Sequence, residues 1–441
     1  MSTQDSTTGV SFPQPVPASA LGRDGHTAPS NRITVGMSGT GNQGIGDMRN
    51  FMRDERVQIV AVCDVNRESR GYWDDAEGGY AVAKRIADEH YSELVGESYN
   101  GVSTFTDFRE LLAQSDIDAV EIATPDHWHA IQVVEAAKAG KDIYCQKPLS
   151  LTVREGRAMS DAVKKYGVVF QTGSQQRSDV NFRRACELVR NGRIGKLHTV
   201  RCGLPGGRPD FGKTIDRKSP EPIPDGFDYD MWLGPAPVAE YAPARCHVNF
   251  RWNLDYSGGQ VTDWGGHHPD CAQWGMDTEY TGPIEIRNAK GVFPEDPIWN
   301  TATEYYFEAV YKNGITLIIS DKEKPGVTWE GTDGWVWADR GKHEASSEEI
   351  FNSEIGPNEI HLYNSPKHFR NFVDCIISRE ATVAPAEIAH RSITICQLGN
   401  IAMRLGKDGL KWDPDTEQII GDDEAAALLH YKYREPWKLE I

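Results

Sequence analysis

The sequence is short of positive charge, of paired cysteines and of long apolar runs. Lys and Arg number 47 against 65 Asp and Glu, and the resulting net charge of −18 at pH 7 would repel nucleic-acid phosphates and anionic lipid. The eight cysteines include no C-x-x-C pair, so no zinc or thiol-redox spacing is present. No run approaches the ~18 apolar residues that cross a bilayer. We therefore expect no nucleic-acid partner, no membrane partner and no metal site.

The first residues lack the apolar stretch of roughly 7–15 residues that marks a secretion signal. Residues 1–31 are rich in Ser, Thr, Pro, Ala and Gly, which predicts a flexible N-terminal segment. As written, the chain is expected to be cytoplasmic. The triplet Ala-Ser-Ala at 18–20 has the form of a cleavage site, so loss of an original signal would make the protein periplasmic or secreted.

What is present suffices for two domains, because 441 residues exceed what one hydrophobic core usually serves. Through residues 32–173, short apolar runs alternate with amphipathic helical patterns, which predicts βαβ units in a Rossmann domain with a doubly wound parallel sheet. The expected strands are 32–37, 57–63, 119–123, 142–145 and 168–171, and the expected helices include about 81–90, 130–139 and 154–166. Residues 72–101, rich in Gly, Tyr and acidic groups, are predicted to be an insertion without an assigned role.

In the second domain, residues 174–441, strand follows strand. The β-rich runs 197–202, 303–311, 314–320 and 329–337 predict a C-terminal α+β domain with a large, mostly antiparallel open sheet. A helix over 388–405 follows, with Gly406 as its C-cap. We expect this domain to bind substrate and, through an uncovered apolar sheet face, to form a homodimer or homotetramer.

A glycine-rich turn follows the first expected strand. Gly39, Gly41 and Gly44 form G-x-G-x-x-G between that strand and a helix, where backbone N–H groups and a helix N-terminus can hold a pyrophosphate. Asp64 ends the next strand, 20 residues after Gly44, where a carboxylate binds the adenosine ribose and repels a 2′-phosphate. NAD is therefore favoured over NADP, although Arg67 would offset that repulsion.

Three residues can carry the chemistry that such a cofactor needs. Moving a hydride to or from a secondary alcohol carbon requires a group that takes or returns the hydroxyl proton. Lys147 follows strand 142–145 at its carboxyl end, where open α/β sheets bind ligands. Asp263 and His267 stand four residues apart, so a helix would place them on one face, whereas the two glycines between them favour a bent turn. Either geometry can bring a carboxylate to an imidazole.

Three motifs, in family order from Arg32 onward, make the chain resemble the Gfo/Idh/MocA oxidoreductase family, which includes glucose-fructose oxidoreductase and inositol dehydrogenase. The family's T-P-x-x-x-H is matched by Thr124, Pro125 and His129. Its E-K-P is matched by Lys147 and Pro148, with Gln146 in place of Glu. Its G-G-x-x-x-D-x-G-x-H-x-x-D is matched by Gly258, Gly259, Asp263, Gly265, His267 and Asp270.

The resemblance implies one site built by both domains, for NAD and a sugar, sugar derivative or cyclitol. Lys147, Asp263 and His267 would be catalytic. The cofactor-binding residues would be Gly39, Gly41, Asn42, Gln43, Gly44, Asp64, Thr124, Pro125, His129, Gln146 and Lys147. Five further residues are substrate-binding candidates. Arg177 follows the last strand of the first domain, and His268 stands beside His267 in the Asp–His motif. Arg208, Trp232 and Tyr256 lie in loops before that motif.

Three functions stay open on these residues. The first, which we favour, is an NAD-dependent oxidoreductase acting on a secondary hydroxyl of a carbohydrate or polyol. The second keeps the fold and cofactor in a redox-neutral glycoside hydrolase or lyase that works through a transient 3-keto sugar, since the family also contains glycosidases. The third is a non-enzymatic NAD-binding sensor, which would not need the proton-transfer residues.

Overall fold

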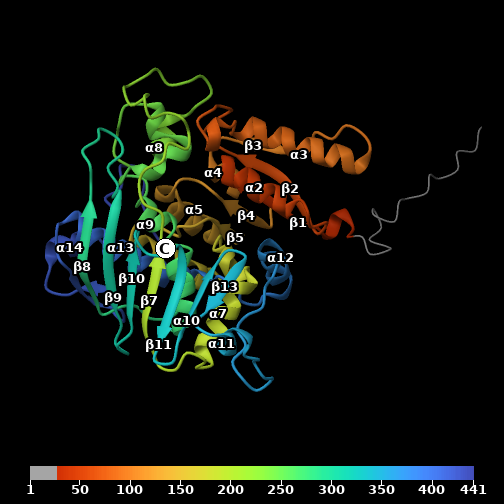
Figure 1. Cartoon of the computed structure of the whole chain (residues 1–441). Helices are drawn as coiled ribbons and strands as arrows, with labels where there is room; N and C mark the ends of the chain where they lie inside the picture. The colour runs from red at the N-terminus through yellow and green to blue at the C-terminus, as the bar shows by residue number, and fades with distance from the viewer. Residues whose placement is uncertain (1–26) are drawn as a thin grey trace, which may run out of the picture.

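Two sheets organise the structure, a computed structural model that describes residues 27–441 (Figure 1). The triplet at 18–20 lies outside the described residues. The first sheet contains β1 (Ile33–Ser38), β2 (Val57–Cys63), β3 (Ser103–Phe105), β4 (Ala119–Ile122), β5 (Asp142–Cys145) and β6 (Phe170–Thr172). Its pairs are parallel in the order β3-β2-β1-β4-β5-β6, which confirms the doubly wound Rossmann sheet. The strand order reverses between β1 and β4, and ligands bind at such a switch point.

We call residues 32–173, with this sheet, the first part of the chain, and residues 174–441 the second part. The helices that connect the strands of the first part are α2 (Asn42–Phe51), α3 (Tyr80–Val95), α4 (Phe108–Leu112), α5 (Asp126–Lys138) and α6 (Val153–Tyr166). Helix α6 begins in a capping box between Thr152 and Glu155 and ends at Gly167 in the left-handed region, so local sequence sets both of its ends. Helix α5 begins four residues earlier than predicted, because its first turn is buried together with the rest of the helix and gives no amphipathic pattern.

Residues 72–101 are not an insertion, contrary to the sequence-based expectation. Helix α3 is the crossover between β2 and β3, which pair in parallel, so this stretch is an ordinary βαβ connection. The strand that completes it, β3, is three residues long and has exposed polar side chains, so it lacks the apolar run that predicts a strand. A short 3₁₀ turn, η2 (Trp73–Asp75), precedes the helix.

The second sheet has nine strands: β7 (Leu197–Gly203), β8 (Glu285–Val292), β9 (Glu304–Val310), β10 (Thr316–Ser320), β11 (Gly326–Gly331), β12 (Trp335–Asp339), β13 (Lys342–Ala345), β14 (Leu410–Asp413) and β15 (Gln418–Ile419). Their order is β13-β12-β11-β7-β10-β9-β8-β14-β15. Within this second sheet, β7 and β10 are the only described strands that pair in parallel, so the predicted open, mostly antiparallel sheet is confirmed. The β-rich run 329–337 is a hairpin of β11 and β12 that turns at 332–334.

Helices cover one face of this sheet. Helices α7 (Val180–Arg190), α10 (His268–Met276) and α13 (Ala386–Arg404) pack on it, behind the strands in Figure 1. Helix α13 ends near the predicted Gly406, whose φ of +61° suits glycine. The opposite face mixes apolar and charged side chains, because Ile318 and Trp337 lie there in register with Arg201 and Thr328, while Arg201 pairs with Glu323 and Glu330 and Arg287 pairs with Glu308.

The remaining elements are short or return to the first sheet. They are η1 (Pro29–Asn31), η3 (Gln175–Ser178), α8 (Tyr229–Leu233), η4 (Pro243–Arg245), η5 (His247–Trp252), α9 (Gln260–Asp263), α11 (Glu348–Asn352), α12 (His368–Ser378) and α14 (Asp423–Ala427). Late helix α12 packs on α2, where Phe372 lies against Phe51 and Tyr144, and α13 contacts α6. Among residues 27–441, no helix is both long and apolar enough to cross a membrane.

Candidate active site

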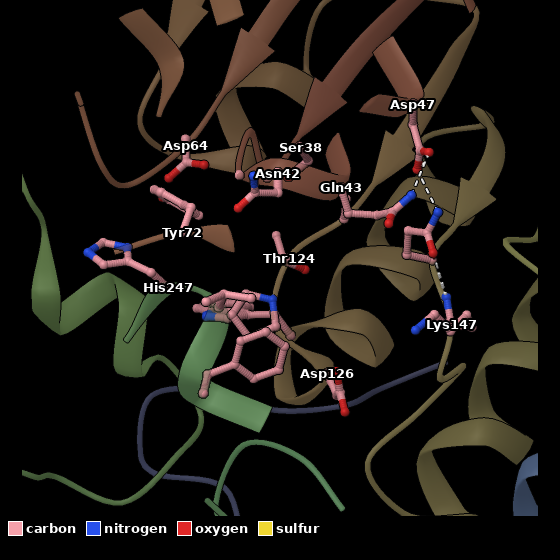
Figure 2. A pocket seen from close by; sticks show the side chains of 18 of the residues that line it. Ser38, Asn42, Gln43, Asp47, Asp64, Tyr72, Thr124, Asp126, Lys147 and His247 are labelled. Carbon is pink, nitrogen blue, oxygen red and sulfur yellow. Dashed lines mark hydrogen bonds between the residues drawn. The ribbon is translucent and has the colours of Figure 1, made fainter. Parts of the chain in front are cut away.

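A cavity of about 710 Å³ lies where β1, β2, β4 and β5 end and the loops of the second part close over them. Figure 2 shows its labelled side chains, with Asp64 and Lys147 on opposite sides of the view. The cavity is lined from both parts of the chain, by the glycine-rich turn and the loops after β4 and β5 on one side and by residues 227–267 on the other. It therefore occupies the switch point that the strand order marks.

The glycine-rich turn fits its place through two glycines. Gly39 has φ of +89°, and a Cβ there would lie 2.7 Å from the backbone of Ala123 and Thr124. A Cβ on Gly44 would lie 1.9 Å from the Gly39 carbonyl oxygen. Glycine at both positions lets α2 start directly beside β4 and point its N-terminal N–H groups at the cavity, a geometry that suits a pyrophosphate. Gly44 does this from behind, since it does not line the cavity.

Asp64 lines the cavity at the end of β2. Its Oδ2 accepts a hydrogen bond from the Thr40 backbone N–H at 2.6 Å, and its Oδ1 accepts one from the Asn66 backbone N–H at 2.9 Å. Tyr72 closes the turn from outside, because a Cβ on Gly41 would lie 2.7 Å from its ring. Arg67 does not line this cavity; it lies in a separate surface groove beside α3.

Lys147, Asp263 and His267 line the cavity together. The Lys147 ammonium donates to Asp263 Oδ1 at 2.8 Å, and Arg251 Nε donates to the same oxygen at 3.3 Å. Asp263 ends α9 and His267 precedes α10, so the bent turn, not a continuous helix, brings them together. A Cβ on Gly266 would lie 2.9 Å from Lys147 Cβ, so glycine there lets the lysine approach.

The charges of this group follow from burial and from one another. Burial opposes ionisation of Asp263, but the Lys147 ammonium and the Arg251 guanidinium outweigh it and hold the pKa of Asp263 well below its usual value. Burial, and then the same ammonium, put the pKa of His267 well below its usual value. At neutral pH Asp263 is therefore a carboxylate, hydrogen-bonded to Lys147, and His267 is a neutral imidazole whose Nδ1 has no hydrogen-bond partner among the described residues.

Asp126, the first residue of α5, is a second acid in the same cavity. Its side chain is buried, and its Oδ2 has no hydrogen-bond partner among the described residues. Burial raises its pKa to about 7, although Ser257 and the positive charges of Arg251 and Lys147 act in the opposite direction. A carboxyl group that titrates near neutral pH is suited to proton transfer.

The cavity takes in most of the cofactor-binding residues expected from the sequence, but not all. Gly39, Gly41, Asn42, Gln43, Asp64, Thr124, Pro125, Gln146 and Lys147 line it. His129 does not, because its two ring nitrogens lie 2.8 Å from the Pro148 carbonyl oxygen and 2.9 Å from the Thr124 carbonyl oxygen. It ties the two loops of the site together from behind.

Of the substrate-binding candidates, only Trp232 lines the cavity. Arg177 is buried between Asp270 and Glu279, and it holds α10 in place by these ion pairs. His268 is buried, with Nδ1 3.0 Å from the Gly203 carbonyl oxygen. Tyr256 packs behind Trp232, and Arg208 lies outside the cavity. Four of the five candidates therefore lie outside the cavity, because a place near a motif in the chain did not bring the side chain into it.

Several lining residues were not predicted. They are Asp47, Tyr72, Trp73, Asp126, His247, Arg251, Trp264 and Arg340, among others. Asp126 stands inside T-P-x-x-x-H and Trp264 stands beside Asp263, so their motifs could have indicated them. Arg251 and Arg340 come from a 3₁₀ helix and a hairpin turn that no local pattern marks.

Comparison with known families covers nearly the whole described chain. The Gfo/Idh/MocA description "Oxidoreductase family, NAD-binding Rossmann fold" matches residues 33–174, and its "Oxidoreductase family, C-terminal alpha/beta domain" matches residues 209–439. A Bacillus subtilis protein, "Uncharacterized oxidoreductase YrbE", is 25% identical over 77% of this chain and 81% of its own length. A Thermotoga maritima myo-inositol 2-dehydrogenase is 38% identical, over 27% of this chain and 37% of its own length.

Solved structures share the fold. The aldose-aldose oxidoreductase from Caulobacter crescentus, complexed with glycerol, superposes with a TM-score of 0.58 at 19% identity, over 86% of this chain and 99% of that one. GenD2 from gentamicin A biosynthesis, in complex with NAD, gives 0.58 at 18% identity, over 87% and 97% of the two chains. With both family descriptions matched in order and the strand order of each sheet observed, the chain belongs to the Gfo/Idh/MocA family of oxidoreductases, whose first domain is a nicotinamide-dinucleotide-binding Rossmann fold.

Proposed function

We propose that the protein transfers a hydride between NAD and a secondary hydroxyl of a sugar, sugar derivative or cyclitol. One observation carries the proposal: the Lys147–Asp263 ion pair and the neutral His267 line the same cavity as the glycine-rich turn and Asp64. An oxidoreductase of this family needs a dinucleotide site and a proton carrier in one cavity, and this cavity contains residues for both.

The chain's own residues divide the work. A bound nicotinamide would exchange the hydride with the alcohol carbon. Lys147, kept in position by Asp263, would donate a hydrogen bond to the reacting oxygen. In reduction its ammonium would supply the proton, and in oxidation it would pass one of its protons to the neutral His267 as it takes up the hydroxyl proton. His267, neutral and with a free Nδ1, would bind a neighbouring hydroxyl or relay the proton. The rings of Trp232 and Trp264, which line the same cavity, suit the C–H faces of a sugar.

Lys147→Ala tests this assignment. We expect turnover to fall by roughly 10²–10⁴, the usual size of a positioned acid–base contribution, while NAD still binds because the glycine-rich turn and Asp64 are untouched. Myo-inositol and levoglucosan are the first substrates to try, since dehydrogenases named for them are relatives. Steady-state rates and calorimetric NAD titration measure the two effects. Near-normal turnover of Lys147→Ala on the true substrate would refute the assignment.

We also propose that NAD is preferred over NADP. The Asp64 carboxylate stands beside the glycine-rich turn with a charge that repels a 2′-phosphate, and Arg67, the residue that would offset this repulsion, does not line the cavity. Asp64→Asn keeps a hydrogen-bond acceptor for the Thr40 N–H but removes the negative charge. We therefore expect it to lower the ratio of the NADP to the NAD dissociation constant about tenfold. Titration of both cofactors against both proteins measures this. Tighter binding of NADP by the unaltered protein, unchanged in Asp64→Asn, would contradict the proposal.

A second candidate function rests on Asp126. Hydride transfer needs one proton carrier, whereas a redox-neutral glycoside hydrolase or lyase also needs a base for the C–H next to a transient keto group. Asp126 adds such a titratable carboxyl to the cavity. A Shewanella oneidensis alpha-N-acetylgalactosaminidase is 27% identical over 42% of this chain. Product formed from a glycoside without net reduced cofactor would favour this function; accumulating reduced cofactor would favour the dehydrogenase.

A further inference from the structure

Gln146 stands where the family motif has Glu, and its amide has two partners. Gln146 Nε2 donates to Asp47 Oδ2 at 2.6 Å, and its Oε1 accepts from the Lys147 backbone N–H at 3.2 Å (Figure 2). Both side chains are buried, with Gln146 3% and Asp47 1% exposed. The amide therefore joins a carboxyl group to the backbone of the proposed catalytic lysine.

Asp47 belongs to α2, the helix that begins at the glycine-rich turn. Its other oxygen, Oδ1, accepts from Gln43 Nε2 at 2.8 Å. Asp47, Gln43 and Gln146 all line the cavity. One carboxyl group thus bridges the dinucleotide-binding helix and the loop of Lys147.

A second buried carboxyl decides which group carries the charge. Glu121 of β4 is buried, its charge and that of Asp47 act on each other, and neither of its carboxyl oxygens has a hydrogen-bond partner among the described residues. Burial, and then the charge of Asp47, raise the pKa of Glu121 well above its usual value, so it stays protonated. Burial raises the pKa of Asp47 only to about 6, since Gln146, Glu121, Gln43 and the charge of Lys147 favour its ionised form. Near neutral pH the pair holds one negative charge, on Asp47.

We propose that Asp47 supplies, across its hydrogen bond with Gln146, the negative charge that the E-K-P motif otherwise places at position 146, and that this charge favours the oxidised cofactor. The inference rests on the proposed function, because it requires a nicotinamide dinucleotide in this cavity. The oxidised ring carries a positive charge that the reduced ring lacks. A buried carboxylate in the same cavity therefore stabilises the oxidised form selectively and partly balances the Lys147 ammonium.

A charge exchange tests the role of Asp47. We expect Asp47→Asn to lower the preference for oxidised over reduced cofactor by about three- to tenfold. Gln146→Glu alone sets two carboxyl groups in hydrogen-bond contact and should lower the melting temperature. The double variant Asp47→Asn/Gln146→Glu exchanges amide and carboxylate across the same bond, so it should regain both the stability and the preference. Glu121→Gln is the matched control, which leaves the charge of Asp47 in place and should keep the preference.

The measurements are calorimetric dissociation constants for NAD and NADH, near pH 7.5, and melting curves of each variant. An unchanged ratio in Asp47→Asn, with both cofactors still bound, would overturn this inference alone. Unaltered protein that binds neither cofactor would instead refute the proposed function. A double variant no more stable than Gln146→Glu would also overturn the inference, and this result does not depend on cofactor binding.

A pH titration of the unaltered protein gives an independent test. The groups that face Asp47 are Gln43 on α2, Glu121 on β4, Tyr144 on β5, and Gln146 and Lys147 after β5. Because Asp47 gains its charge as pH rises through about 6, the ratio of NADH to NAD dissociation constants should rise about three- to tenfold over that range. Asp126 also titrates near neutral pH, so the same pH titration is repeated with Asp126→Asn, in which this carboxyl group is absent. A ratio that stays flat in both proteins would overturn the inference.

Discussion

At the scale of single residues, burial raises the pKa of several acids in the site and near it. The pKa of Asp126 is raised to about 7, that of Glu155 to about 7 and that of Asp47 to about 6, in each case chiefly by burial. A folded-state pKa above the unfolded value means that the folded protein binds more protons, so the stabilising contribution is full at low pH and is lost as pH rises through the folded pKa. The free energy of unfolding should therefore fall from about pH 4 to about pH 7.

Asp126→Asn should flatten this pH dependence. Its carboxyl group contributes at most about 4 kcal/mol of the fall between about pH 4 and about pH 7, and an amide contributes none. The difference in the free energy of unfolding, variant minus unaltered protein, should therefore be more favourable to the variant at about pH 7.5 than at about pH 4.5. Urea unfolding at the two pH values measures the difference. Glu295→Gln, at an exposed position, is the control; if Asp126→Asn and this control behave alike, Asp126 is ordinary in the folded state.

The residues of the site could be predicted where a motif fixes a backbone position. The glycines of the G-x-G-x-x-G turn, Asp64 and Lys147 follow strands or turns whose place in a Rossmann sheet is known in advance, and all except Gly44 line the cavity. Arg177 also follows such a strand, but Asp270 and Glu279 hold its guanidinium away from the cavity. Such a pairing between distant segments leaves no local signal, and so it could not be predicted.

At the scale of elements, an aromatic contact closes the cavity over the dinucleotide-binding turn. Trp73 of η2 stacks on Phe211 with ring centroids 4.0 Å apart and an angle of 16° between the planes. The Trp73 backbone N–H donates to Asn42 Oδ1, within the glycine-rich turn. Trp73 lines the cavity and is 49% exposed, so it contributes more to covering the cavity than to the core.

Phe211→Ala should therefore loosen cofactor binding more than it lowers stability. Loss of one stacked pair costs about 0.5–1.5 kcal/mol, which corresponds to a roughly two- to tenfold rise in the NAD dissociation constant, mainly through faster release. Stopped-flow measurement of NAD release tests this. Phe351→Ala, which removes a similar stack with His343 outside the cavity, is the control and should release NAD at the normal rate. Equal release rates in all three proteins would contradict the role of the stack.

Elements were predictable where burial leaves a period in the sequence. The strands β2 and β5 were predicted at their observed bounds, because apolar residues predominate in both of them. Strand β3 was missed because hydrogen bonds to β2, and not its own side chains, hold it at the sheet edge. The hairpin of β11 and β12 was predicted as one run because aromatic residues lie on both sides of its turn.

At the scale of the whole molecule, the two sheets are joined by more than their linker. The carboxyl-terminal residues cross back to the first part, where Trp437 packs edge-on against Trp128 at 4.7 Å and Tyr433 donates to Glu155 at 2.6 Å. Trp128 also lines the cavity. These contacts fasten the carboxyl-terminal residues to α5 and α6, next to the cavity. The domain boundary that we expect between residues 173 and 174 therefore separates the two sheets along the chain, but the carboxyl-terminal residues pack across it.

The uncovered face of the second sheet is where we expect copies of the chain to associate. Its charges are arranged in ion pairs such as Arg201 with Glu330, so an interface there would be polar and weakened by salt. Thr328 lies opposite Arg201 on this face, and its hydroxyl makes no hydrogen bond with the described residues. Thr328→Arg should therefore leave the fold intact but keep two copies of this face from packing closely. Sedimentation at micromolar concentration should show a dimer or tetramer for the unaltered protein and for Thr104→Arg, at an exposed position on β3, but a monomer for Thr328→Arg. A monomeric unaltered protein, or a Thr328→Arg variant that keeps the full assembly, would show that this face is not the interface.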